Sequence, residues 1–438
     1  MKKLTFILMF TAVSCNIFAQ FSRTSYFMEG SSQRIQLNPA LRPTKGFVDI
    51  PAIGALNVAA FTNSLTVKDI TNFIDSEDKF YHSDVYNRLK DDNKLNINVN
   101  TDIVSFGFYK GKGFWTGNIG LRTDIGASIP RAMFEYSRDF YDEAAGTTGV
   151  YDIRNQSVNI NAYVETGVGY SRILTDKLTV GARVKFLLGV ANADAKIDQF
   201  YVNVNDTYAE VISKGHIDIS ASGLELETSI DENNKEYIDD ADFDKFGFGG
   251  YGAGIDLGVS YKAMDNLTLS AAVLDFGFIS WDKSSTTSGI AQNNFREDFD
   301  YENYYWNTDG IFDLEEIGYE IVDPKSRTTS LATTLVLGGE YSFMQNKLSA
   351  GLLSVTRFGK IRTLSELTLS ANYRPKKWLE TTFSYSVIQS GFKTFGLGVK
   401  VGPVFLATDY MYLGKKSKNA SVYLGISVPL GKKKSEEK

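Results

Sequence analysis

The residues whose side chains could most readily do chemistry are isolated charged residues that interrupt runs of Ser, Thr, Asn and Gly. Both signs occur among them, so ion pairs inside the protein are the chemistry that they predict. The alternative is a sheet face whose charges are solvated. The set comprises Arg122, Glu165, Arg183, Lys185, Asp256, Glu340, Glu366 and Lys400.

Catalytic and metal chemistry have few candidate residues in this chain. The 438 residues include two histidines, His82 and His216, and one cysteine, Cys15. One cysteine and two histidines are too few for a disulfide scaffold or a Cys/His zinc site. A serine hydrolase would have to use one of the two histidines as its base. We therefore expect no enzymatic activity, no catalytic residue, no bound metal and no cofactor.

The segments that carry the isolated charges alternate strictly between apolar and polar or small side chains. This period of two is typical of β-strands with one apolar face and one polar face. Clear examples are 158–165, 178–186, 255–261, 367–373, 397–401 and 422–428. Short runs of turn residues separate several of these segments, at 110–113, 175–177, 265–266 and 345–347. The pattern predicts a meander of about 14 strands, within a range of 14–16.

The N-terminus has the features of an export signal. Lys2 and Lys3 precede an apolar run, and Ala19 supplies a small residue at the expected cleavage point. Residues 1–19 are thus predicted to be a signal peptide. A lipoprotein box ending at Cys15 is the alternative. After residue 19 no stretch approaches 18 consecutive apolar residues, so no transmembrane helix is expected.

An exported, alternating all-β chain can be a soluble sandwich or a membrane barrel. A sandwich turns its polar face to water, whereas a barrel turns its apolar face to lipid and its polar face to the lumen. The small, sparsely charged polar face favours an antiparallel transmembrane β-barrel over 47–430, in the outer membrane and in contact with its lipid. One short helix is expected at 130–143 and a charged tail at 431–438.

Two insertions concentrate the acidic residues. Residues 230–245 hold seven acids and two lysines, and residues 296–323 hold ten acids and one arginine. They are predicted to be solvent-facing loops, and loose calcium binding by their carboxylates is the alternative. With a net charge of −6, the chain is not expected to bind nucleic acid.

The first residues after the signal carry a distinctive pattern. It runs through Tyr26, Phe27, Met28, Glu29, Arg34, Asn38, Pro39 and Ala40. With 50–54 (Ile-Pro-Ala-Ile-Gly), it resembles the start of an uncharacterised family of Gram-negative outer-membrane barrels. The Asn-Pro-Ala step is also similar to the N-terminal motif of the long-chain fatty-acid transporter superfamily, which includes PorV-like shuttle barrels of secretion systems.

That resemblance implies 14 strands and an N-terminal hatch over 20–46 that plugs the lumen. A plain periplasmic leader is the alternative for this segment. It also implies that a small hydrophobic molecule is bound or passed through the plugged lumen. A second hypothesis is a structural or secretion-associated barrel that docks a secretion or surface protein through the two acidic loops.

Overall fold

The computed structural model describes residues 22–51, 55–66, 68–69, 83–141, 148–205, 207–230, 236–243, 247–298, 319–388, 394–411 and 417–431. The predicted signal peptide and nearly all of the charged tail lie outside these residues. So does most of the second acidic insertion.

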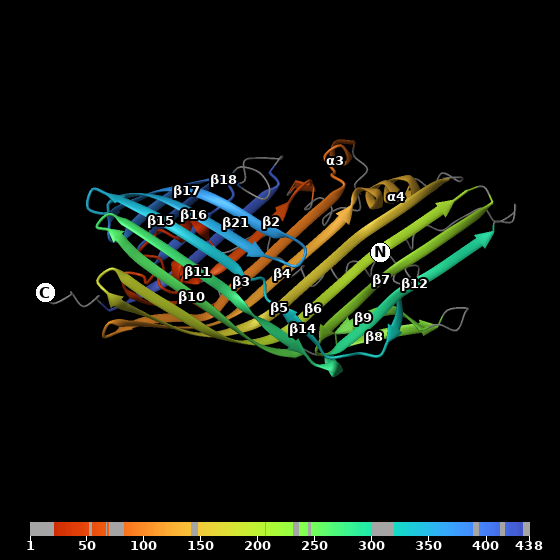
Figure 1. Ribbon diagram of the computed structural model, residues 1–438, viewed down its shortest axis with the longest axis horizontal. Coiled ribbons are helices and arrows are strands. Elements are labelled where there is room, and N and C mark those ends of the chain that lie inside the picture. Colours follow the sequence, from red (N-terminus) through yellow and green to blue (C-terminus); the bar gives the residue numbers. More distant parts are fainter. Residues whose placement is uncertain are drawn as a thin grey trace.

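The described strands form one closed antiparallel barrel with fourteen positions around the ring (Figure 1). Closure is shown by the last strand, which pairs with the first two, while these also pair with the third. The predicted all-β barrel of about 14 strands is therefore confirmed. In ring order the strands are β1 (Gly46–Asp49) with β2 (Leu56–Thr62), β3 (Asp92–Lys110), β4 (Gly113–Pro130), β5 (Gly149–Thr175), β6 (Leu178–Val204), β10 (Gly250–Met264), β11 (Leu267–Trp281), β14 (Arg327–Ser330) with β15 (Thr334–Phe343), β16 (Leu348–Phe358), β17 (Thr363–Lys376), β18 (Leu379–Ile388), β19 (Phe395–Val401), β20 (Val404–Thr408) and β21 (Asn419–Leu430).

The two faces of the barrel wall are reversed relative to a water-soluble protein. In β6, Val184 and Phe186 are 63% and 52% exposed, whereas Arg183 and Lys185 are 5% and 3% exposed. The same alternation recurs around the ring, because Val168, Leu257 and other apolar side chains point outward. An outer face of this kind suits lipid rather than water, so the soluble sandwich does not describe this chain.

Aromatic side chains collect on the outer face near the short turns. Tyr170, Tyr341, Phe343, Tyr373 and Trp378 are all exposed there. Two other aromatic residues that lie near strand ends, Trp281 and Tyr410, are fully buried instead. Among the described residues, no helix is both long enough and apolar enough to cross a membrane.

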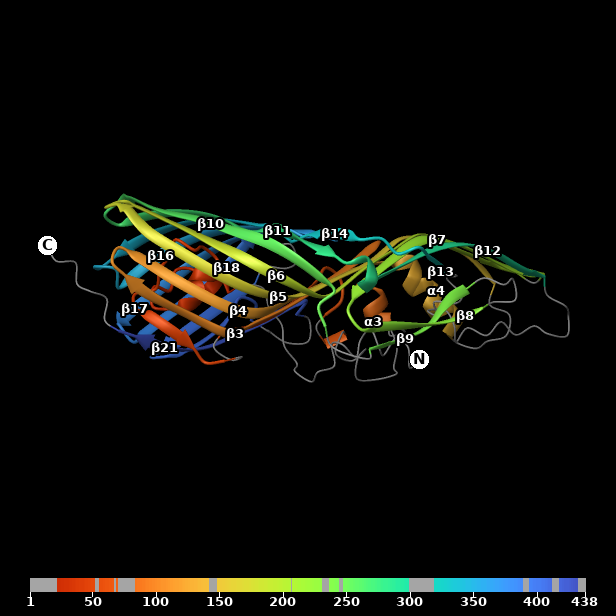
Figure 2. The same ribbon diagram turned by 90° about the horizontal axis from the view of Figure 1, so that it is seen from below.

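A sheet continues beyond one end of the barrel, which the sequence did not predict (Figures 1 and 2). β5 and β6 are each 27 residues long, far beyond the roughly ten residues that a tilted strand needs to cross a bilayer. β6 pairs with β10 along its first half and with β7 along its second half. The extension continues through β7 (Tyr208–Ala221), β12 (Thr286–Asp298), β13 (Tyr319–Val322), β9 (Glu236–Phe243) and β8 (Leu224–Ile230).

The extension corrects one prediction. The acidic insertions are not wholly loops, because their described parts form β9, β13 and the end of β12, and Glu320 pairs with Tyr237 across the two insertions. The predicted helix is present as α4 (Arg131–Tyr141), and it packs Met133 and Tyr136 onto Ile153 and Phe200. A second helix, α3 (Ser83–Tyr86), and a 3₁₀ turn, η3 (Lys283–Ser285), were not predicted.

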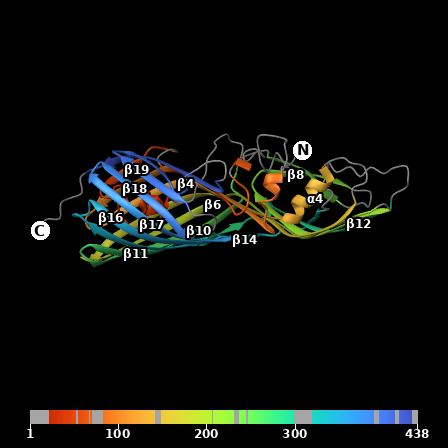
Figure 3. The same ribbon diagram turned by 90° about the horizontal axis from the view of Figure 1, so that it is seen from above.

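Residues 22–45, named here the inner segment, lie inside the ring of strands (Figure 3). They form two short 3₁₀ turns, η1 (Arg23–Ser25) and η2 (Ser32–Gln36), each capped by a serine side chain. Almost all of their side chains are buried, including polar ones. The segment therefore takes the place of a conventional hydrophobic core inside the barrel.

Candidate functional site

The inner segment is seated on glycines of the barrel wall. A Cβ at Gly181 would lie 2.4 Å from the backbone of Pro39, and a Cβ at Gly258 would lie 2.1 Å from the Asn38 Oδ1 atom. Gly338 and Gly351 leave the same kind of space for the rings of Tyr26 and Phe27. These wall positions must therefore be glycine for the segment to approach so closely.

Side chains of the Asn-Pro-Ala step and of Tyr26 add specific hydrogen bonds. Asn38 donates from Nδ2 to the carbonyl oxygens of Ala271 (3.2 Å) and Val259 (3.3 Å), and its Oδ1 accepts from the Ala40 backbone nitrogen at 2.9 Å. The Tyr26 hydroxyl lies 2.9 Å from Ser270 Oγ. One asparagine thus turns its own backbone and joins it to two wall strands.

The start of the inner segment is held by one carboxylate, Asp409, just after β20. It accepts hydrogen bonds from the backbone nitrogens of Arg23 (2.9 Å) and Thr24 (2.8 Å) and from the Tyr423 hydroxyl (2.7 Å). The Thr24 hydroxyl also donates to it. The Arg23 guanidinium lies 3.4 Å from it and pairs with Glu366 as well.

The remaining predicted hatch residues are placed as follows. Met28 is buried in a cluster with residues of β2 and β20, and Arg34 is 6% exposed. Glu29 is half-buried, and its backbone oxygen accepts from the Thr44 nitrogen at 3.1 Å. All eight residues lie in the inner segment, and their role as a hatch stays a prediction.

Five of the eight predicted lumenal charges join one buried network, named here the charge ladder. It consists of Asp102, Arg122, Glu165, Lys185, Arg183, Asp256 and Asp275, from six adjacent strands, β3 to β6, β10 and β11. Arg122 pairs with Asp102 (2.7 Å) and Glu165 (3.1 Å), and Arg183 lies 3.6 Å from Asp256. Lys185 Nζ lies 2.5 Å from Asp275, 2.9 Å from Asp256 and 3.3 Å from Glu165.

The other three predicted charges lie elsewhere. Glu340 pairs with Arg374, which also donates to the Phe27 backbone oxygen. Glu366 contacts Arg23 and accepts from the Tyr410 hydroxyl at 2.5 Å. Lys400 is half-buried and donates to the Gly402 backbone oxygen at 2.8 Å.

Sequence reasoning missed Asp102 and Asp275 because β-bulges break the period of two beside them. Ile103 and Val104 both point outward after Asp102, and Leu274 and Asp275 are both buried. Asp275 also has φ +55°, in the left-handed region. A bulge inserts one extra residue and reverses the parity of all that follows it, so strict alternation assigns the wrong face.

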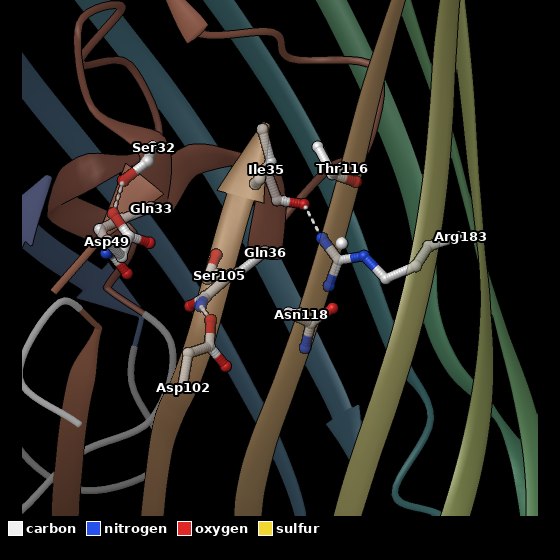
Figure 4. A pocket seen from close by; sticks show the side chains of 11 residues that line it. Ser32, Gln33, Ile35, Gln36, Asp49, Asp102, Ser105, Thr116, Asn118 and Arg183 are labelled. Carbon is white, nitrogen blue, oxygen red and sulfur yellow. Dashed lines mark hydrogen bonds between the residues drawn. The ribbon is translucent and has the colours of Figure 1, made fainter. Parts of the chain in front are cut away.

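The charge ladder and the inner segment together line a small polar cavity (Figure 4). Gln36 donates to Asp102 at 2.9 Å, and Arg183 donates to the Ile35 backbone oxygen at 2.9 Å. Asp49 and Asn118 complete this polar cavity. Each ladder end is therefore tied to the backbone or side chains of the inner segment.

A second, partly open cavity is named here the chamber. It is bounded by Arg23 and Leu37 of the inner segment and by Val355 and Arg357 of β16. Among the described residues, no group of three or more His, Cys, Asp or Glu side chains is arranged to hold a metal ion.

The turn 359–362 between β16 and β17, together with the neighbouring Arg357, contacts strands β4 and β6. Arg357 pairs with Asp124 of β4 at 2.9 Å, and Lys360 pairs with Asp194 of β6. Ile361 lies so close to Gly126 of β4 that a Cβ there would be 2.9 Å from it. Because β4 is third and β16 ninth around the ring, these contacts join opposite sides of the barrel.

The sequence model of DUF5723, described as a family of unknown function, matches residues 39–409. No curated protein matches the chain. The structure is similar to the toluene transporter TbuX of Ralstonia pickettii, with 11% identity, a TM-score of 0.43, and coverage of 94% of this chain and 98% of that one. It is also similar to a TodX deltaS2S3 mutant monoaromatic hydrocarbon channel, with 12% identity, a TM-score of 0.43, and coverage of 91% of this chain and 95% of that one. A FadL homologue of Pseudomonas aeruginosa is similar as well, with 10% identity, a TM-score of 0.30, and coverage of 94% of this chain and 97% of that one.

Proposed function

This chain belongs to the DUF5723 family of unknown function, and on that premise we propose an outer-membrane barrel that passes small hydrophobic molecules. Membership confirms the predicted resemblance to an uncharacterised family. In the proposal the protein is exported by a cleaved signal, its outer face meets outer-membrane lipid, and it has no enzymatic activity.

The inner segment acts as the hatch of this barrel. The observation that supports passage is that the inner segment precedes the first strand, lies on wall glycines and is bordered by two cavities. Its contacts to the wall combine the apolar packing of Tyr26, Phe27 and Leu37 with hydrogen bonds and ion pairs, and water can replace the polar contacts as the segment moves. A shift of the segment would join the two cavities into one path.

A disulfide that ties the inner segment to the wall tests this function. The hydroxyl oxygens of Thr24 and Ser384 of β18 are 3.3 Å apart, so Thr24→Cys with Ser384→Cys places two thiols within bonding reach. We expect oxidation to reduce uptake of labelled toluene into cells by at least about tenfold, and reduction to restore it.

The matched control links two wall strands and leaves the inner segment free. Thr368 of β17 and Ser386 of β18 have hydroxyl oxygens 3.2 Å apart, so Thr368→Cys with Ser386→Cys forms the same bond elsewhere. Uptake through this control is expected to be independent of its redox state. Equal uptake through the oxidised and reduced forms of the Thr24–Ser384 variant would contradict a moving hatch.

The second candidate is a barrel that docks a secretion or surface protein. The observation that favours it is the extension, because a projecting sheet offers strand edges and a broad surface to a partner. Under this alternative the locked variant remains fully functional, and deletion of 296–323 abolishes co-purification of the partner.

A further inference from the structure

Three residues that line the chamber, Asn98, Arg122 and Arg23, carry buried polar atoms without a hydrogen-bond partner among the described residues. On Arg23 these atoms are the two terminal nitrogens, although the charge of this guanidinium is paired with Glu366 and Asp409. Asn98 is 2% exposed, and its Nδ2 donates to Asp124 Oδ1 at 2.5 Å, whereas no group in the described part of the chain reaches its Oδ1. Arg122 is 5% exposed and uses both terminal nitrogens, yet its Nε has no acceptor among the same residues. Buried polar atoms are normally paired, so an unpaired acceptor and an unpaired donor in one cavity point to a ligand.

The charges around the chamber do not suit an anion. Each guanidinium that lines it already has carboxylate partners, namely Glu366 and Asp409 for Arg23, Asp102 and Glu165 for Arg122, and Asp124 for Arg357. Five carboxylates thus face three guanidinium groups. The lining carboxylate of Asp275 is paired in turn with Lys185 at 2.5 Å. A carboxylate ligand would therefore find no uncompensated positive charge and would meet an excess of negative charge.

The rest of the lining is apolar or aromatic. Leu37 of the inner segment and Val355 of β16 lie on two sides, and Tyr163 of β5 adds a ring. Leu37 and Val355 also belong to one hydrophobic cluster, so the apolar part of the chamber is continuous with the packing of the inner segment. A ligand here can bury a compact apolar body while it keeps a polar head beside Asn98 and Arg122.

We propose that the chamber binds an uncharged small molecule with a hydroxyl-type head on an apolar body. The head donates to Asn98 Oδ1 and accepts from Arg122 Nε, so it must contain both a donor and an acceptor. The inference rests on the proposed function and deepens it, because it names the chemical class that the barrel selects. It excludes both a bare hydrocarbon and a carboxylate as the preferred ligand.

Three fluorinated probes with one scaffold test the class directly. 4-Fluorotoluene, 4-fluorophenol and 4-fluorobenzoate differ only in the head, which is apolar, uncharged with both a donor and an acceptor, or anionic near neutral pH. Fluorine NMR titration of the full-length protein in detergent measures each dissociation constant, with empty micelles as the blank. We expect 4-fluorophenol to bind at least about tenfold more tightly than either other probe, since a site built for a polar head rejects analogues that leave its atoms unpaired.

Two variants of the same strand separate the chamber from general effects. Asn98→Leu removes the acceptor at similar volume, and we expect it to bring the phenol-to-toluene affinity ratio down to about one. Asn96→Leu is the matched control, because Asn96 lies two residues away on the same face, also bonds Asp124, and does not line the chamber. The control is expected to keep the wild-type ratio. A mobility shift on unheated gels confirms that each variant forms a closed barrel.

Equal or tighter binding of the toluene or benzoate probe would overturn the assignment. So would an unchanged ratio in Asn98→Leu, or the absence of saturable binding by all three probes. These results would overturn the assigned ligand class alone. The proposed function would still stand if the disulfide between residues 24 and 384 blocks uptake. Conversely, uptake that ignores that disulfide would contradict the function even where the chamber binds 4-fluorophenol.

Discussion

Removal of the Asp409 carboxylate should release the inner segment from the wall. This side chain accepts from the backbone nitrogens of Arg23 and Thr24 and from the hydroxyls of Thr24 and Tyr423. Hydrogen bonds to a charged group contribute about 1.5–3 kcal/mol each. Two lost backbone bonds therefore correspond to about 3 kcal/mol or more, and 1.4 kcal/mol is a factor of ten in an equilibrium constant.

We expect Asp409→Ala to raise the undocked population of the inner segment by about 100-fold on that basis. Asp409→Asn keeps one oxygen of the carboxylate as an acceptor. It should therefore retain one of the two backbone bonds and raise the population only about tenfold. A larger undocked population in Asp409→Ala than in Asp409→Asn is as informative as the size of either increase.

Thiol labelling measures this population. Ser25 is fully buried in the first turn of the inner segment, so Ser25→Cys reacts with a maleimide only while the segment is undocked. The labelling rate in outer-membrane fractions is then proportional to the undocked population. Asp265→Asn is the control, because its carboxylate lies fully exposed on a short turn. An acceleration of less than about threefold in Asp409→Ala, or a faster rate in Asp409→Asn than in Asp409→Ala, would refute this account of the anchor.

Two further perturbations address the seat and the lipid face. Gly181→Val should displace Pro39, because even a Cβ at residue 181 would lie 2.4 Å from the Pro39 backbone, and it should therefore increase uptake of large antibiotics. Gly339→Ala is the control and should not increase this uptake, because its Cβ would have a nearest contact of 3.6 Å. Equal antibiotic sensitivity of the two variants would argue against the contact between Pro39 and Gly181. Val184→Lys places a charge on the outer face and should cost up to about 2–4 kcal/mol of folding free energy in lipid vesicles. Val150→Lys, equally exposed (64% against 63%) but on the extension, should cost little, and equal losses would contradict the lipid-facing assignment.

The sequence alone determined the regularly alternating strands, their faces away from bulges, and their short connections. Alternation along 178–186 and 367–373 is a local property, because successive side chains of a strand point to opposite sides whatever the strand pairs with. Turn residues at 110–113 and 345–347 likewise act within a few residues. An uncharacterised barrel family was also predicted from the sequence, on the resemblance of residues 26–54 to its start, and the family match over 39–409 agrees with that prediction.

Only the tertiary structure decided which of these strands meet and what fills the ring. Arg23 and Asp409 are 386 residues apart, so their contact exists only once the barrel closes around the inner segment. The change of partner in β6 from β10 to β7, which creates the extension, leaves the alternation of β6 itself unchanged. The bulges beside Asp102 and Asp275 reverse the parity of their strands, and that reversal depends on the register of the neighbouring strand. Pairing, closure and register are non-local, and for that reason the charge ladder and the chamber could not be predicted from the order of the residues.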